Sequence, residues 1–239
     1  MTLVITQKTN ILPEQMGPGA LTRVMIDAEG AGGHLVRRLV DVAADGSYAG
    51  MTGGGGELWF VIAGAAELEV QGAGASRTFR VGRDQGLRVP AGAMYRLRPA
   101  GREPVQLDVV SLPGPFVSAK GCEVLTVDLA ECEVETTGDR RFRVLFGPGR
   151  GCAAATQFVG EIPPGRAPEH SHPYDEVVLI LAGQGVVHTG GGTVHPLTAG
   201  SCVHLPPGQP HCLENTGDEP LMVLGVFHPG GSPAQKEQR

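Results

Sequence analysis

Long apolar runs, basic clusters and export signals are all missing from this sequence. No apolar run is long enough to span a membrane, and the opening MTLVITQK lacks the charged start, apolar centre and small-residue cleavage site of a signal peptide. The net charge is −6 and comes without a basic run, which argues against nucleic acid or an anionic membrane surface as a partner. We therefore expect a cytoplasmic protein with no membrane or nucleic-acid partner.

Cysteine is scarce and is not arranged for pairing. The five cysteines are an odd number without any CxxC spacing, so a disulfide framework is not indicated. We expect reduced, mostly buried thiols at Cys122, Cys132, Cys152, Cys202 and Cys212.

Glycine and proline, by contrast, are abundant. The 37 glycines and 19 prolines are spread through the 239 residues as turn signals rather than gathered in low-complexity tracts. This distribution favours many short strands, and the length allows one large or two small domains with a hydrophobic core. We predict an almost all-β protein.

Histidines and an acidic residue gather in two short stretches. The first, Gly165–Glu176, contains the pair His170 and His172, and the second, Gly200–Asn215, contains His211. Side chains two apart on an extended strand point to the same side, so the His-x-His pair presents two imidazoles together. Proline lacks the ladder donor, which predicts a corner after the pair and a new strand starting at Glu176. One site could then be formed by His170, His172, Glu176 and His211.

These residue types indicate a particular class of metal. Three imidazole nitrogens and one carboxylate suit divalent iron, manganese, nickel, copper or zinc, whereas magnesium and calcium prefer oxygen ligands. Four protein ligands leave two positions of an octahedral ion open for substrate, water or dioxygen. We therefore predict one divalent transition metal per chain, with Fe²⁺ favoured and Glu176 and His211 also assigned to catalysis. The alternative is that these are ordinary strand histidines.

The spacing of these residues resembles the motifs of the cupin superfamily. The first motif runs Gly165, His170, His172, Glu176, Gly183, with four residues rather than five between the glycine and the first histidine. The second matches throughout, at Gly200, Pro206, Gly208, His211, Asn215. The resemblance implies a double-stranded β-helix, or jelly-roll, barrel that holds the metal.

An internal repeat indicates a second barrel. Pro90, Gly92 and Tyr95 recur 116 residues later as Pro206, Gly208 and His211, while Gly46, Glu57 and Gly64 recur 119 residues later as Gly165, Glu176 and Gly183. The simplest account is two tandem cupin barrels, so the resemblance is to the bicupins.

The first copy has lost most of the metal ligands. Met51, Gly53 and Tyr95 stand where the second copy has histidines, and only Glu57 is kept. Trp59, two residues after Glu57, should point to the same side of the strand and fill much of a small barrel. We predict a metal-free scaffold over residues 1–115. The alternative is a metal-independent ligand pocket floored by Met51, Trp59 and Tyr95.

Between the copies lie strand-like runs. Residues 116–150 are predicted to link the barrels, and residues 151–239 to form the metal-binding barrel. In the run Arg140–Phe146 the apolar residues alternate with Arg141 and Arg143, which suggests that these arginines lie on a wet face. An arginine clamp for a carboxylate is the other interpretation of this run.

Side chains two or four residues from Glu176 and His211 should point to the same face of their strands, and this identifies candidate residues of the substrate pocket. We predict that Val178, Ile180 and Leu213 point inward beside the metal, and we add Gln157 and its neighbour Phe158 although a loop interrupts the phase. This mainly apolar lining suits a small, partly hydrophobic ligand that coordinates the metal through oxygen.

We interpret the histidines outside the four candidate ligands as surface or packing residues. His188 and His195 lie on the two sides of one hairpin and could face each other, and His204 could approach the site from an adjacent strand.

Two classes of function remain open. Similarity to the dioxygenase members of the superfamily implies an iron(II) enzyme acting on a small molecule, while other cupins carry out isomerisation, cyclisation, decarboxylation or lyase chemistry. The second class is a non-catalytic small-molecule binding protein. Bicupins often dimerise through their sheets, so a homodimer is plausible.

Overall fold

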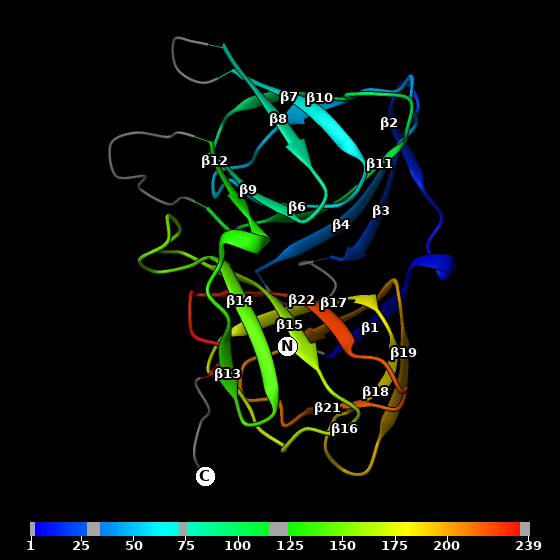
Figure 1. Ribbon diagram of the computed structural model, residues 1–239, viewed down its shortest axis with the longest axis vertical. Helices are drawn as coiled ribbons and strands as arrows, with labels where there is room; N and C mark the ends of the chain where they lie inside the picture. Colours follow the sequence, from blue (N-terminus) through cyan, green and yellow to red (C-terminus); the bar gives the residue numbers. More distant parts are fainter. Residues whose placement is uncertain (1–2, 28–33, 72–75, 115–123, 235–239) are drawn as a thin grey trace. The chain divides into compact units, whose positions relative to one another are not determined.

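A computed structural model describes residues 3–27, 34–71, 76–114 and 124–234 of the chain. These residues are almost entirely strands and turns, so the all-β expectation is confirmed. The chain divides into two compact units (Figure 1). We call Ile11–Met25 with Leu35–Glu131 the N-terminal barrel, and Met1–Asn10 with Ile26–His34 and Cys132–Arg239 the C-terminal barrel.

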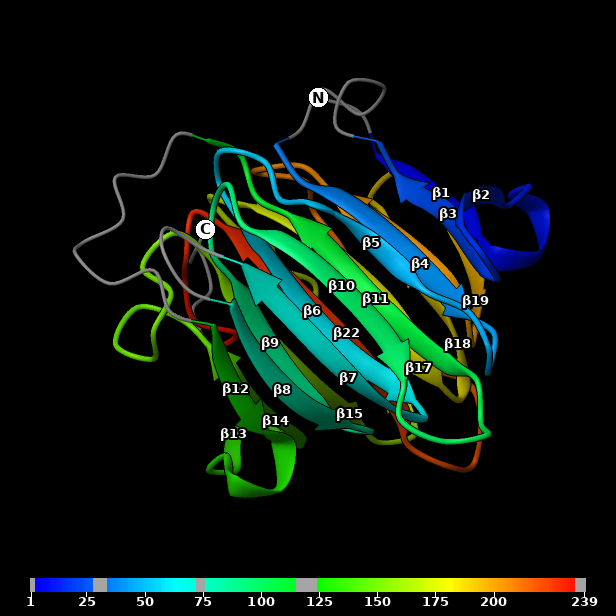
Figure 2. The same cartoon turned by 90° about the horizontal axis from the view of Figure 1, so that it is seen from above.

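The N-terminal barrel consists of two antiparallel sheets. The larger has the order β12-β9-β6-β11-β4-β3-β2 and the smaller the order β5-β10-β7-β8. In the larger sheet β4, β11 and β6 run side by side (Figure 2). The strands are β2 (Glu14–Gly17), β3 (Ala20–Ile26), β4 (Val36–Val42), β5 (Tyr48–Met51), β6 (Glu57–Ala63), β7 (Ala65–Gln71), β8 (Ser76–Gly82), β9 (Gln85–Val89), β10 (Met94–Pro99), β11 (Val105–Ser111) and β12 (Leu125–Asp128), with a 3₁₀ turn η2 at Leu129–Glu131.

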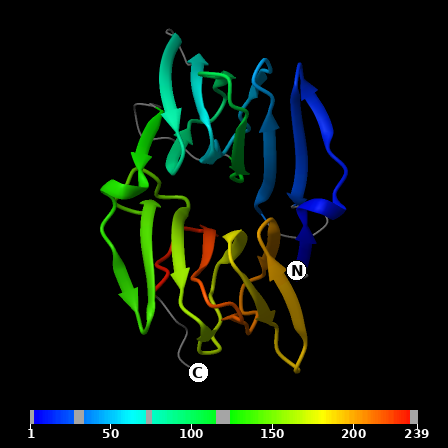
Figure 3. The same cartoon turned by 45° about the vertical axis from the view of Figure 1, so that its right-hand side comes forward.

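The C-terminal barrel repeats this pattern. Its larger sheet has the order β1-β20-β17-β22-β15-β14-β13 and its smaller sheet the order β16-β21-β18-β19. Figure 3 shows β13, β14, β15 and β22 as neighbouring green, yellow-green and red strands. The strands are β1 (Val4–Gln7), β13 (Glu135–Thr137), β14 (Arg140–Phe146), β15 (Thr156–Ile162), β16 (Gly165–Arg166), β17 (Asp175–Ala182), β18 (Gln184–His188), β19 (Val194–Thr198), β20 (Ser201–Leu205), β21 (Cys212–Asn215) and β22 (Leu221–His228), with a 3₁₀ turn η1 at Lys8–Asn10.

The division of the chain differs from the expected boundaries at 115 and 150. Strand β1 pairs with β20, so the first ten residues belong to the C-terminal barrel. The expected linking segment is shared, because β12 pairs with β9 of the N-terminal barrel whereas β13 and β14 extend the sheet that contains β15. Residue 115 itself lies outside the described residues. A strand joins whichever sheet edge offers free backbone groups, and position along the chain does not specify that edge.

Each barrel has its own core, drawn from both of its sheets. In the N-terminal barrel Trp59 and Leu87 of the larger sheet pack with Leu68 and Leu97 of the smaller one. In the C-terminal barrel the corresponding cluster includes Phe142, Phe158, Val178, Val187, Leu197 and Phe227. Alternating apolar positions on both sheets therefore produce the buried layer of each jelly roll.

Two predictions about composition can be compared with this structure. Cys132, Cys152, Cys202 and Cys212 are buried, as expected, and Cys122 lies outside the described residues. Among the described residues, no helix has the length and apolar character needed to cross a membrane.

Candidate metal centre

The two motif stretches are held together by their own backbones. His170 and His211 form an isolated antiparallel bridge in which each backbone N–H donates to the other residue's carbonyl, at N···O distances of 3.0 and 2.9 Å. The N–H of Gly208 donates to the carbonyl of His172 at 2.7 Å. The Pro-x-Gly turn of the second motif is thus fastened to the His-x-His pair, so both motifs reach one point of the barrel.

The corner expected after Pro173 is present and positions two further side chains. Residues 173 and 174 form a bend, and β17 begins at Asp175, one residue earlier than predicted. The ring of Tyr174 stacks on His172 with 4.8 Å between ring centroids and 12° between planes. Its hydroxyl donates to the carbonyl of Ser232 at 3.0 Å, which fixes the stacking partner in place.

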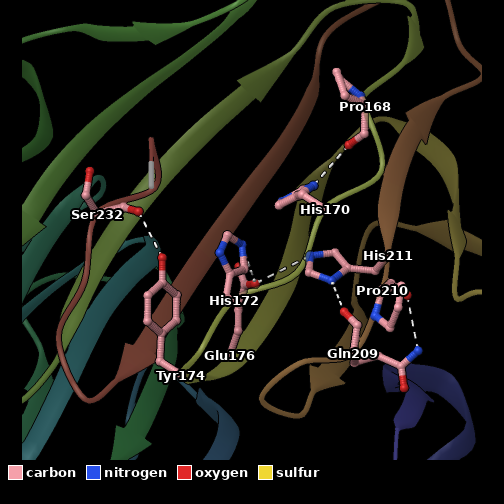
Figure 4. Close-up of polar contacts among 9 residues, drawn as sticks. All are labelled: Pro168, His170, His172, Tyr174, Glu176, Gln209, Pro210, His211 and Ser232. Carbon is pink, nitrogen blue, oxygen red and sulfur yellow. Dashed lines mark hydrogen bonds and ion pairs between the residues drawn. The ribbon is translucent and has the colours of Figure 1, made fainter. Parts of the chain in front are cut away.

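The four predicted ligands converge (Figure 4). A ring nitrogen from each of His170, His172 and His211 lies within 4.8 Å of the others. The Oε2 atom of Glu176 is 3.6 Å from Nε2 of His172 and 3.8 Å from Nε2 of His211. Glu176, His172 and His211 are buried, while His170 is partly exposed. Both distances from Glu176 exceed hydrogen-bond length, and the four side chains surround one shared point.

Backbone carbonyls determine which ring nitrogens carry protons. Nδ1 of His170 lies 3.0 Å from the carbonyl oxygen of Pro168, and Nδ1 of His211 lies 2.9 Å from that of Gln209. A carbonyl only accepts, so each Nδ1 must be the donor and each Nε2 carries the lone pair. Such outer hydrogen bonds are the usual means of orienting metal-binding imidazoles.

The electrostatic surroundings also favour neutral rings. Burial lowers the pKa of His211 to about 4, the charges of His170 and Arg140 lower it as well, and the hydrogen bond to Gln209 opposes them. His211 is therefore uncharged at neutral pH, which is the form that binds a metal. Three nitrogens and one carboxylate fit a divalent transition ion better than magnesium or calcium.

A small cavity of about 70 Å³ opens onto these four residues. Of the predicted pocket residues, Val178 and Leu213 line it, whereas Gln157 and Ile180 do not. Gln157 is adjacent to Phe158, a lining residue of β15, and neighbouring side chains on a strand point to opposite faces. Ile180 lies on the same face of β17 as Val178, as expected, but it is two residues further along the strand and packs into the core cluster.

Phe158, which the sequence nominated together with Gln157, lines the cavity, and several further lining residues were not identified from the sequence. Three phenyl rings, of Phe142, Phe158 and Phe227, form much of the apolar wall, and Arg140 adds a charge. Phe142 and Arg140 lie on β14, the strand expected to link the barrels. The alternation in the sequence does place Arg140 on the same face of the strand as Phe142 and Val144. That face could not be related to the site, because the sequence does not show that β14 joins the barrel sheet.

The remaining histidines have other partners. Nε2 of His204 contacts Oδ1 of Asp175 at 2.5 Å, on the face of β17 opposite Glu176, so His204 does not approach the site. His188 and His195 do not face each other, because the register pairs His195 with Val187. Nε2 of His188 instead lies 2.7 Å from a carboxylate oxygen of Glu214.

The corresponding positions of the N-terminal barrel are arranged differently. Glu57 accepts hydrogen bonds from Nε1 of Trp59 at 2.8 Å and from the hydroxyl of Ser111 at 2.9 Å. Trp59 and Tyr95 are buried edge to face with centroids 4.8 Å apart, whereas Met51 is 68% exposed. The carboxylate is thus engaged by protein donors, and Met51 does not join the two rings in one pocket floor.

Comparison with known proteins agrees with this architecture. A family model described as "Cupin domain" matches residues 158–227. A gentisate 1,2-dioxygenase from a Ralstonia species is 33% identical over 96 residues, which cover 37% of this chain and 27% of the relative. An oxalate-binding protein from Thermotoga maritima is 38% identical over 69 residues, covering 28% of this chain and 56% of the relative. The matched stretches therefore span about a quarter and just over half of these relatives.

Solved structures match almost the whole chain. Oxalate decarboxylase from Bacillus subtilis superposes with a TM-score of 0.75 at 16% identity, covering 95% of this chain and 76% of that one. Protein Ylba from E. coli superposes with a TM-score of 0.77 at 15% identity, covering 95% and 90%. At these identities the likeness shows the fold.

The fold is that of two tandem cupin barrels, and residues 158–227 match the cupin domain. The candidate metal centre lies in the C-terminal barrel, which contains the matched residues.

Proposed function

We propose that this bicupin is a metal-dependent dioxygenase that acts on a small, partly apolar molecule bearing oxygen atoms. The observation that carries the proposal is the convergence of His170, His172, His211 and Glu176 at a cavity whose other walls are largely apolar. The similarity of part of the chain to a gentisate 1,2-dioxygenase supports oxygen chemistry in particular.

The protein's own residues have separable roles in this proposal. The three histidines and Glu176 would hold the ion, which supplies a Lewis acid and, if it is iron(II), a reductant for dioxygen. The hydrogen bonds from His170 and His211 to backbone carbonyls keep both rings in the ligating tautomer. The rings of Phe158 and Phe227 exclude water from the reacting centre.

A non-redox reaction or simple binding is the second candidate. It is favoured by the similarity of 69 residues to an oxalate-binding protein and by the fold shared with oxalate decarboxylase. In that case the same ligands would hold an ion that polarises or orients the ligand without consuming oxygen.

Oxygen uptake separates the two candidates. The metal-free protein is reconstituted anaerobically with iron(II), and uptake is followed with small hydroxylated aromatic and aliphatic molecules. We expect substrate-dependent uptake by the wild type, none by His211→Ala, and normal uptake by His188→Ala, which removes a histidine outside the site. Turnover of a ligand without oxygen consumption would move the assignment to non-redox chemistry.

A further inference from the structure

Arg140 occupies an unusual place beside the candidate metal centre. It begins β14 with the same parity as Phe142 and Val144, both of which pack against the core of the C-terminal barrel. Its side chain lines the cavity that contains His170 and His211. A guanidinium therefore faces the position where a ligand of the metal would lie.

The neighbouring arginines have protein partners, and Arg140 does not. Arg143 contacts Glu161 at 3.0 Å and Arg141 contacts it at 3.5 Å. Within the described residues the side chain of Arg140 makes no hydrogen bond or ion pair, and its Nε atom is buried. Burial lowers the pKa of Arg140, and the negative charges of Asp139 and Glu176 act on it only from beyond ion-pair distance.

A half-buried guanidinium without a partner is costly unless a ligand satisfies it. Glu176 would be occupied by the metal, so the missing partner is an external anion. The planar fork of arginine matches the two oxygens of a carboxylate. The rest of the cavity wall is mainly apolar, with Phe142, Phe158 and Val178 on it, and the volume of about 70 Å³ admits only a small molecule. The ion pair of Arg141 with Glu161 and the side chain of Thr137 also line the cavity.

We propose that Arg140 binds the carboxylate of a small substrate whose remaining body is apolar, and that it places this substrate against the metal centre. Only the placement of the substrate against the metal rests on the proposed function, because the carboxylate site itself is defined by β14 and the cavity. Arg140 is thus a specificity-determining residue that selects carboxylates over neutral analogues.

Isothermal titration calorimetry tests this with protein that contains Zn²⁺ or no metal, because neither form can turn over a substrate by redox chemistry. Benzoate, 2-methylpropanoate and the two corresponding amides are titrated into wild type, Arg140→Gln and Arg143→Gln. Loss of a charge-assisted contact should weaken carboxylate binding about 10- to 100-fold in Arg140→Gln and leave the amides unchanged. Arg143→Gln removes the same charge from the same strand, outside the cavity, and should bind like the wild type.

Three outcomes would overturn the proposal: a wild type that prefers neither carboxylate to its amide, an Arg140→Gln variant that binds both carboxylates normally, and an equal loss in Arg143→Gln. Failure of the proposed function looks different. Carboxylate binding that depends on Arg140 but is indifferent to metal, in a protein that consumes no oxygen, would remove the dioxygenase assignment and keep the carboxylate site.

Discussion

At the scale of single residues, the candidate metal centre depends on four side chains and on the backbone carbonyls that orient two of the imidazoles. His-x-His alternation and motif spacing are sufficient to nominate His170, His172, Glu176 and His211 because each depends only on local periodicity. The carbonyls of Pro168 and Gln209, which set the ring tautomers, come from loops whose path no periodic pattern determines. Gln157 illustrates the same limit, since a loop of unknown path separates it from the nearest motif.

Glu57 allows a residue-scale test in the N-terminal barrel. Burial raises the pKa of this carboxyl, and its hydrogen bonds from Trp59 and Ser111 only partly oppose that rise. A group whose folded pKa lies above its unfolded value costs stability as pH rises through that interval. Glu57→Gln should therefore raise the unfolding midpoint at pH 8 by a few degrees and change it little near pH 4.

Trp59 is the only tryptophan, so its fluorescence reports unfolding of this barrel directly. The control is Glu67→Gln, at an exposed position of β7, which should have no effect at either pH. A Glu57→Gln variant that is less stable than the wild type at pH 8 would contradict the account, because it would mean that the ionised carboxylate stabilises the fold.

At the scale of elements, strand type was easier to predict than strand pairing. Alternation correctly placed Val178 inward on β17 and indicated strands over residues 140–146. It could not show that β14 extends the C-terminal sheet, which is why Arg140 and Phe142 were not connected with the site. Pairing partners are set by contacts across the fold, and a local pattern carries no information about them.

Strand β1 provides the element-scale test. It pairs with β20, placing Ile5 opposite Val203, and Ile5 packs against the core of the C-terminal barrel. Ile5→Asp puts a charge against that core and should destabilise this barrel by about 1–3 kcal/mol. In urea titrations followed by circular dichroism, the transition of the C-terminal barrel should move to lower urea. The Trp59 fluorescence transition serves as the internal reference, and a shift of the fluorescence transition alone would contradict the assignment of β1.

At the scale of the whole molecule, the internal repeat predicted two barrels and the structure contains them. The copies share sheet order yet differ in chemistry. In one, three imidazoles and a carboxylate converge on a cavity, whereas in the other Glu57 is engaged by Trp59 and Ser111. Ligand loss was visible in the sequence because it changes residue types. The exact boundaries were not visible, since β1 joins its sheet from the other end of the chain and β14, in the expected linking segment, extends that sheet beside β15.

The most direct test of the account is the metal content of the protein purified without added metal or chelator. Inductively coupled plasma mass spectrometry should find one divalent transition metal per chain in the wild type and in His188→Ala, and about a tenth of that or less in His211→Ala. Circular dichroism of His211→Ala should show an intact β-sheet fold, so that metal loss is not a result of unfolding. Two metals per chain, or unchanged metal in His211→Ala, would contradict a single centre formed by His170, His172, Glu176 and His211.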